Sequence, residues 1–182
     1  DKGYASATGD YGLYITKLWG DTSGAFGYTV NNKMSSGLSD KVSAGDSVVA
    51  YIYSDATAYS DKYTYFDKNS VTVKANEEVT LTLSGLGYDE NWQTVVSPLA
   101  DATITVDGEK TEYQTDSNGK VTISLKGGKT YTVSASADTL IVPPICLVTV
   151  EKSGSAVVWI VAGAVLIVIG VGMLVATKKK KQ

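Results

Sequence analysis

Histidine and arginine are both absent from this 182-residue sequence, and cysteine occurs only once, at Cys146. Histidine is the commonest general base, proton shuttle and metal ligand of proteins near neutral pH. Its absence excludes serine or cysteine catalysis through a histidine partner. The single cysteine excludes an internal disulfide framework and a zinc site built from several cysteines.

Carboxylates remain as candidate acids and bases, but their spacing does not set any pair apart. Asp89 and Glu90, for example, look like ordinary solvated charge. Asp55, Asp61 and Asp67 lie six residues apart, whereas a calcium loop of the EF-hand type needs oxygen ligands at alternate positions. We therefore expect no enzymatic activity, no catalytic residues and no metal site.

Phenylalanine is scarce as well, with two residues against twelve tyrosines. Tyrosine together with abundant threonine, valine, serine and glycine favours strands and turns over helices. At 43% hydrophobic residues, the chain is long enough for one or two small domains with real cores. The soluble part of the chain is thus predicted to be all-β.

Alternating apolar and polar residues predict strands within residues 11–20 and 44–55, and two strands joined at residues 75–78 within residues 69–85. Three or four more strands are expected between residues 101 and 136. The turns there are predicted at Asp107-Gly108, residues 117–119 and Gly127-Gly128.

The strand pattern lapses between residues 87 and 101, where Pro98 occurs, and this predicts a domain boundary. We expect two small β-sandwich-like modules, residues 1–90 and 91–153, followed by a single transmembrane helix. The second module is small and is expected to lean on the first for its core.

Residues 156–176 form a run of twenty-one residues without charge, followed at once by "TKKKK". At 1.5 Å per residue this run spans a hydrocarbon core of about 30 Å. We predict a transmembrane helix at residues 154–177 and a cytoplasmic basic tail at residues 178–182. The predicted anchoring residues are Trp159, at the outer interface, and Lys178, Lys179, Lys180 and Lys181.

The positive-inside rule places the lysine tail in the cytoplasm and the N-terminal part outside the cell. An outward N-terminus needs a secretory signal, and Asp1 opens without one, so we expect a mature sequence. Outside the tail, twelve lysines stand against nineteen acidic residues. Such an acidic part does not suit nucleic acid.

Small residues recur every seven positions in the apolar run, at Ala156, Gly163, Gly170 and Thr177. One face of small side chains favours close helix pairing, which predicts a homo-oligomer formed through the transmembrane helix. The alternative is that glycine is simply frequent in membrane helices.

The stretch "SDATAYSDKYTYFD", residues 54–67, is the best candidate site, because tyrosines offer rigid contact area at low entropic cost. If "KYTYF" is a strand, Tyr63 and Tyr65 share one face and Phe66 belongs to the core. The alternative is that the tyrosines cover one side of a thin sandwich. The candidate ligand- or partner-binding residues are Tyr59, Asp61, Tyr63, Tyr65, Tyr88 and Trp92.

The remaining aromatic candidates and the cysteine have two interpretations each. Tyr88 and Trp92 form an aromatic pair that lines an interdomain groove or is plain loop. Trp19 ends an apolar strand beside Gly20 and is expected in the core rather than at a contact surface. Cys146 alternates with Ile145 and Leu147, which favours a buried thiol over an intermolecular disulfide.

The segments "SGAFGYTVNN", "AGDSVVAYIYSD" and "SDKYTYF" resemble bacterial domains related to the C-terminal β-domain of transcobalamin. Those domains have a glycine-aromatic-x-Val-Asn turn and then a Gly-Asp-x-Val strand, and the resemblance covers about residues 10–85. It implies a corrinoid held between this domain and a helical partner. The 182 residues could not build that partner, so a corrinoid is expected only with another chain or on one exposed face.

Residues 98–136, "PLADATITVDGEKTEYQTDSNGKVTISLKGGKTYTVSAS", resemble prealbumin-type or Cna-B-like modules, which have a TDxxGK turn before a strand. The module is placed at about residues 98–150. The resemblance implies a spacer or stalk element of a bacterial surface. Some such modules carry a Lys-Asn isopeptide bond, but "ICLVTVEK", the last strand, has no asparagine.

Together these features predict a single-pass protein of the cell membrane, from a Gram-positive-like bacterium, with its N-terminus outside. We expect it to act without catalysis, through surface interaction or adhesion, on an extracellular protein or glycan. The alternative is a surface receptor for a small molecule of the corrinoid (cobalamin) type, acting with a partner chain.

Overall fold

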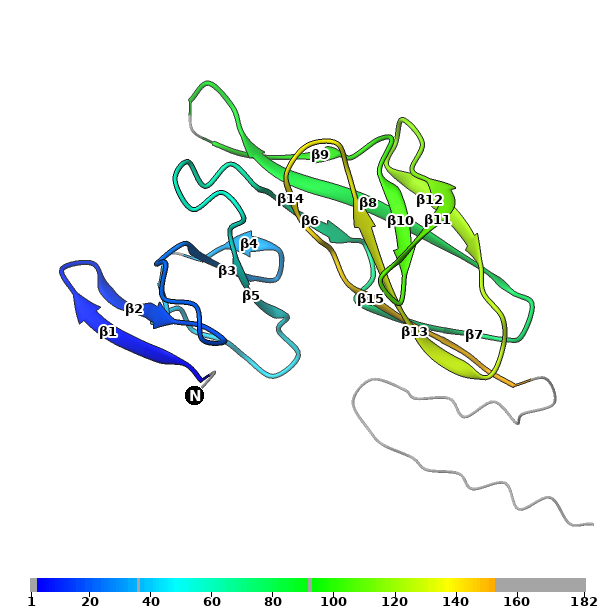
Figure 1. Cartoon of the computed structure of the whole chain (residues 1–182), viewed down its shortest axis with the longest axis horizontal. Helices are drawn as coiled ribbons and strands as arrows, with labels where there is room; N and C mark the ends of the chain where they lie inside the picture. Colours follow the sequence, from blue (N-terminus) through cyan, green and yellow to red (C-terminus); the bar gives the residue numbers. More distant parts are fainter. Residues whose placement is uncertain (1–2, 36, 92, 153–182) are drawn as a thin grey trace, which may run out of the picture.

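The computed structural model describes residues 3–35, 37–91 and 93–152, and every regular element in these residues is a strand (Figure 1). This confirms the all-β prediction. In chain order the strands are β1 (Ala5–Gly9), β2 (Gly12–Lys17), β3 (Phe26–Val30), β4 (Lys33–Met34), β5 (Val48–Ile52), β6 (Lys62–Phe66), β7 (Ser70–Val73), β8 (Glu78–Tyr88), β9 (Thr94–Pro98), β10 (Thr103–Val106), β11 (Glu109–Gln114), β12 (Lys120–Ser124), β13 (Lys129–Ser136), β14 (Ile141–Val142) and β15 (Cys146–Val150).

Strands β6 to β15 form a β-sandwich of two sheets. One sheet has the order β11-β10-β13-β15-β7, and the other has the order β12-β8-β6-β14, with β9 also paired to β8. Neighbouring strands are antiparallel except for the pairs β7–β15 and β6–β14, which are parallel. The two sheets enclose one core, to which both contribute buried aliphatic side chains.

Strict alternation of side chains positions this core. In β8, Val79, Leu81 and Leu83 are buried while the threonines between them are not. A strand turns alternate side chains to opposite faces, so this pattern presents one continuous apolar face. Burying a leucine side chain contributes about 1.5–3 kcal/mol. Cys146 begins β15 on the inward face and is fully buried, as predicted.

Tight turns connect β10 to β11 and β11 to β12 where the sequence predicts them. Asp107 and Gly108 both have positive φ, 51° and 88°, as a two-residue hairpin turn requires. Gly119 also has a positive φ, 71°, and a Cβ at this position would overlap the carbonyl oxygen of Leu83. Glycine at residue 119 therefore serves both the turn and the close approach of β8.

The two strands predicted within residues 69–85 are present as β7 and β8, but they do not pair with each other. β7 joins β15 in one sheet, and β8 joins β12 and β6 in the other. The turn between them thus crosses from one layer of the sandwich to the other. Strands from both sides of residue 90 share each sheet, so one core spans the predicted division into residues 1–90 and 91–153.

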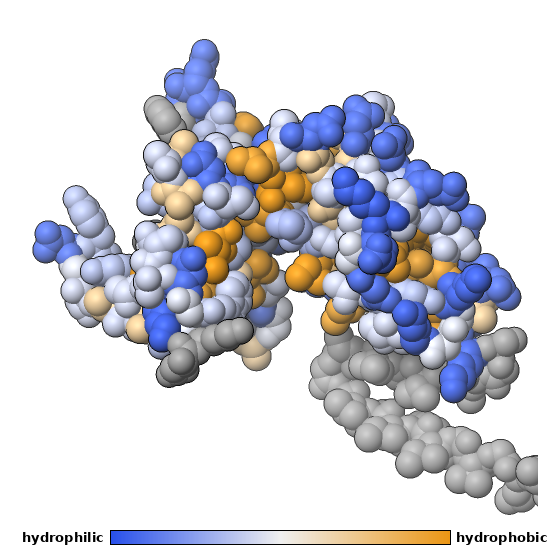
Figure 2. Space-filling view, viewed as in Figure 1, coloured by the Kyte–Doolittle hydropathy of each residue, from blue (hydrophilic) through white to orange (hydrophobic). Residues whose placement is uncertain are grey.

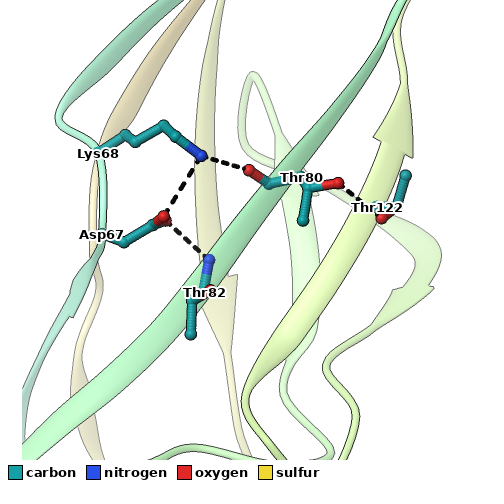
Figure 3. A network of polar contacts seen from close by, with 5 residues as sticks. All are labelled: Asp67, Lys68, Thr80, Thr82 and Thr122. Atoms are coloured by element: carbon teal, nitrogen blue, oxygen red, sulfur yellow. Dashed lines mark hydrogen bonds and ion pairs between the residues drawn. The ribbon is translucent and has the colours of Figure 1, made fainter.

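A polar network fixes the end of β6 to the outer face of the second sheet (Figure 3). The Asp67 carboxylate accepts the backbone N–H of Thr82 at 2.8 Å, and the Lys68 amine donates to the carbonyl oxygen of Thr80 at 2.8 Å. The hydroxyls of Thr80 and Thr122 lie 2.9 Å apart. These contacts join the segment after β6 to β8, and β8 to β12, on the solvent-facing side of the sheet.

The N-terminal part lies beside the sandwich and consists of the β1–β2 hairpin and a sheet of order β4-β3-β5 (Figure 1, blue to cyan). A second core cluster, made of Tyr51, Tyr63, Leu86 and Val142, joins this sheet to the sandwich. Tyr51 lies across Gly27 of β3, where a side chain would collide with its ring. The absence of a Cβ at Gly27 thus makes room for a buried aromatic ring.

No helix among the described residues is long and apolar enough to cross a membrane. The predicted span at residues 154–177 and the basic tail at residues 178–182 lie outside the described residues, as do Trp159 and Lys178 to Lys181.

Candidate functional site

A compact turn between β5 and β6 positions the candidate tyrosines, and two aspartates organise it. The buried Asp61 carboxylate accepts backbone N–H groups from Ser54 at 3.0 Å and Asp55 at 2.9 Å. Asp55 in turn accepts the N–H of Ala58 at 2.9 Å and the hydroxyl of Ser60 at 2.7 Å. Aspartates readily form such local bonds to neighbouring backbone, so these residues fold the turn onto itself.

The protonation of these aspartates follows from the same contacts. Burial alone raises the pKa of Asp61, but the hydrogen bonds from Asp55 and Ser54 outweigh it, so the pKa lies below its ordinary value. Hydrogen bonds from Ala58 and Ser60 lower the pKa of Asp55. Both groups therefore carry a negative charge at neutral pH, and their oxygens are occupied by the turn.

A row of tyrosine rings crosses from the N-terminal sheet to the sandwich. Tyr51 and Tyr63 stack with ring centroids 5.5 Å apart, and Tyr53 meets Tyr51 edge-on at 5.1 Å. Tyr59 meets Tyr53 edge-on at 5.3 Å, and Tyr65 stacks on Tyr63 at 6.1 Å. Such offset and edge-to-face pairs contribute about 0.5–1.5 kcal/mol each beyond the area they bury.

Tyr63 connects the sandwich to the N-terminal sheet, and its hydroxyl forms two hydrogen bonds. It accepts a hydrogen bond from the buried Thr29 hydroxyl at 3.0 Å and donates one to the Asn32 side chain at 3.0 Å. The side chain is only 5% exposed. Burial raises the pKa of Tyr63, so the hydroxyl remains neutral and able to donate.

A pocket of about 270 Å³ opens over these rings, and we call it the tyrosine pocket. Tyr59 and Tyr88, which are 50% and 55% exposed, offer their rings to solvent there. The lining residues are Met34, Tyr53, Tyr59, Ser60, Asp61, Lys62, Tyr63, Leu86, Gly87 and Tyr88. They come from β4, from the β5–β6 turn, from β6 and from the end of β8.

Four of the six candidate residues, Tyr59, Asp61, Tyr63 and Tyr88, therefore line one pocket. Tyr65 lies instead in a neighbouring hollow of about 240 Å³. Trp92, the sixth, lies outside the described residues. The candidates also differ in exposure, since Tyr59 faces solvent whereas Tyr63 and Asp61 are buried.

Sequence reasoning missed Tyr53, Lys62, Met34 and Leu86 as pocket residues. Tyr53 had a signal, because it alternates with Tyr51 in "VVAYIYSD" and had to share its face. Met34 and Leu86 carried none, because they reach the pocket from β4 and β8, and only the packing of the two parts brings them there.

The expectation that Trp19 belongs to the core is wrong, because its side chain is 61% exposed. The strand pattern ends at Lys17, and Trp19 occupies the corner of a tight turn with φ 51°. The turn is closed by two backbone hydrogen bonds between Leu18 and Asp21, of 3.0 and 2.9 Å. An apolar residue at a turn corner has no face toward the core.

Trp19 instead lines a larger hollow of about 490 Å³ between β5 and the sandwich. Figure 2 shows hydrophobic residues on both sides of the junction between these two parts. Within the described residues, no group of three or more histidine, cysteine, aspartate or glutamate side chains is placed to hold a metal ion.

Comparisons with models of protein families, with characterised proteins and with solved structures found no match. The transcobalamin-like and Cna-B-like resemblances thus stay predictions from the sequence.

Proposed function

We propose that the chain is a single-pass surface protein that displays a non-catalytic binding module outside the cell, with the tyrosine pocket as its contact site. The apolar run at residues 156–176 and the lysine tail support the membrane anchor. The single observation that carries the binding role is that Tyr59 and Tyr88, from segments distant in sequence, flank one pocket with exposed rings.

The lining favours an extracellular protein or glycan as partner. Half-exposed tyrosines give flat contact area and a hydroxyl at little cost in side-chain entropy. The Asp61 carboxylate is occupied by backbone N–H groups, so it supports the turn rather than reacting with a ligand. At about 270 Å³ the pocket takes a side chain or one sugar unit of a larger partner. Small-molecule sites usually occupy about 300–1,000 Å³.

The alternative function is a corrinoid receptor. It is supported by the transcobalamin-like resemblance within residues 10–85. A corrinoid macrocycle is much larger than the tyrosine pocket and would lie against one face, with a partner chain on the other. Mixing the full-length protein with cobalamin distinguishes the two functions. A coloured complex of fixed stoichiometry would favour the receptor.

The binding role is tested by changing both exposed rings at once. Full-length protein in lipid nanodiscs is applied to a glycan array and to a panel of purified extracellular proteins. Tyr59→Ser combined with Tyr88→Ser should lower binding of any captured partner at least tenfold, since aromatic anchors often carry about 2 kcal/mol or more apiece. Tyr11→Ser is the matched control, because Tyr11 is fully exposed on the β1–β2 turn. Equal binding by both variants would contradict the proposal.

A further inference from the structure

Among the residues that the structure describes, the backbone groups on the edge of β5 that faces away from β3 have no strand partner. The N–H of Asn31 donates to Ser47, and the N–H of Tyr53 donates to Ala25, each at 2.8 Å. Residues of an antiparallel strand alternate between facing and not facing their neighbour. Val48, Ala50 and Ile52 therefore turn their N–H and C=O groups away from β3. In the described part of the chain, β5 pairs with β3 and with no second strand.

The open edge of β5 lacks the features that normally protect an edge strand from pairing with other chains. Exposed edges are usually blunted by charged residues, proline or a bulge, because an open edge pairs with other chains. β5 reads Val-Val-Ala-Tyr-Ile, and its register with β3 is unbroken. β11, an edge strand of the sandwich, carries Glu109, Lys110 and Glu112 instead.

The hollow of about 490 Å³ runs along this edge. Four consecutive β5 residues, 49–52, line it, so the backbone edge of the strand faces it. Opposite lie three hydroxyl side chains, Thr105, Thr132 and Ser134, from β10 and β13. The other lining residues are Trp19, Gly108, Val142, Pro143 and Ile145.

The described residues that line this groove include no charged side chain, although the whole chain carries nineteen acidic residues and sixteen lysines. A charged partner would lose its hydration here without gaining a counter-charge. The occupant that matches the groove is neutral, offers backbone hydrogen bonds to β5 and alternates apolar with hydroxyl side chains.

We propose that the β5 groove binds an extended, uncharged peptide segment of another protein, which adds to β5 as a further strand. This mode, strand addition at a sheet edge, takes its affinity from backbone hydrogen bonds and its specificity from the flanking side chains. A segment of about five residues can pair along the full length of β5. The groove is a second site, distinct from the tyrosine pocket, and does not depend on the function proposed for that pocket.

A blocked hexapeptide, acetyl-Thr-Val-Thr-Val-Thr-Val-amide, tests this with isotope-labelled full-length protein in nanodiscs. We expect saturable shifts and slower hydrogen exchange at the amides of Val48, Ala50 and Ile52. Two peptides serve as controls and should not produce these changes: one with lysine in place of threonine, and one N-methylated at alternate residues.

Ala50→Pro removes one outward N–H and leaves the pairing with β3 intact, because proline is tolerated where the N–H faces away from the sheet. Binding of the hexapeptide should weaken about tenfold, as for the loss of one hydrogen bond. Thr72→Pro is the matched control, since among the described residues β7 pairs with β15 alone and the N–H of Thr72 faces away from β15. It should leave binding unchanged.

Three results would overturn the proposal. The first is that millimolar hexapeptide changes neither the shifts nor the hydrogen exchange of the β5 amides. The second is that the N-methylated peptide produces equal changes. This second comparison tests the backbone hydrogen bonds even if Ala50→Pro fails to fold. The third is concentration-dependent self-association that Ala50→Pro abolishes, which would make a second copy of the chain the occupant.

Discussion

The tyrosines of the β5–β6 turn and of β6 divide into structural and exposed residues, and single substitutions separate them. Tyr63→Ala removes a buried ring together with its bonds to Thr29 and Asn32. We expect it to lower the free energy of unfolding by about 3 kcal/mol or more. Tyr59→Ala removes an exposed ring with one edge contact, to Tyr53, and should cost about 1 kcal/mol or less. Denaturant titration measures both, and equal losses would contradict the division.

Asp61 gives this turn a pH dependence whose sign follows from its lowered pKa. A carboxylate with a lower pKa in the folded state stabilises the protein above the ordinary aspartate pKa of about 3.9. That stability is lost as the pH falls through the lowered folded-state pKa. The free energy of unfolding should thus be level near neutral pH and fall in acid below about pH 4.

Asp61→Asn is the control for this pH dependence. An amide oxygen cannot titrate, so the variant should be less stable than the wild type at pH 7, and the difference should shrink in acid. Melting temperatures between pH 2 and pH 7, about the range over which aspartates titrate, measure the effect. A difference that stays constant across this range would show that Asp61 does not account for the dependence.

At the scale of elements, the turn at Gly119 separates two effects of glycine. Gly119→Ala places a Cβ in a positive-φ position and against the Leu83 carbonyl oxygen. Gly45→Ala also introduces a Cβ at positive φ, 96°, but into open space. We expect a loss of about 1 kcal/mol at Gly45 and clearly more at Gly119. Thermal melts compare the variants, and equal losses would mean that β8 shifts to accommodate the new Cβ.

Turns and strand faces, whose sequence signals are local, were predicted correctly more often than the pairing of strands. The Asp107-Gly108 turn and the buried face of Phe66 follow from residue types and alternation alone. The partners of β7 and β8 do not, because both strands alternate correctly and a hairpin would have satisfied the same pattern. Only the shared core decides that they lie in opposite layers. Trp19 was misplaced because the strand ends at Lys17, two residues before it, and the Leu18–Asp21 turn follows.

At the scale of the whole molecule, one core crosses residue 90. Leu81 and Leu83 of β8 are fully buried in the same cluster as Ile104 and Ile123, which lie beyond that residue. A chain ending at residue 90 would expose these leucines. It should therefore lack a cooperative thermal transition by circular dichroism, whereas residues 1–152 should show one. A cooperative melt of the shorter chain would instead support two independent modules.

The candidate site was partly predictable at this scale. The tyrosine-rich stretch could be identified from composition, and three of its candidates, Tyr59, Asp61 and Tyr63, meet Tyr88 of β8 in one pocket. The sequence contains no signal for the junction that brings β4 and β8 to the same pocket, because packing between distant segments leaves no local pattern. The same holds for the β5 groove, which exists only between two parts of the fold.

Protease treatment of intact cells tests whether the protein is anchored and displays this β fold outside the cell. The full chain carries an epitope tag after Gln182, and proteinase K is added from outside. We expect that the β fold is removed and that a small tagged fragment, containing residues 156–182, is protected. Protection of the full-length chain in intact cells, with digestion only after lysis, would contradict it.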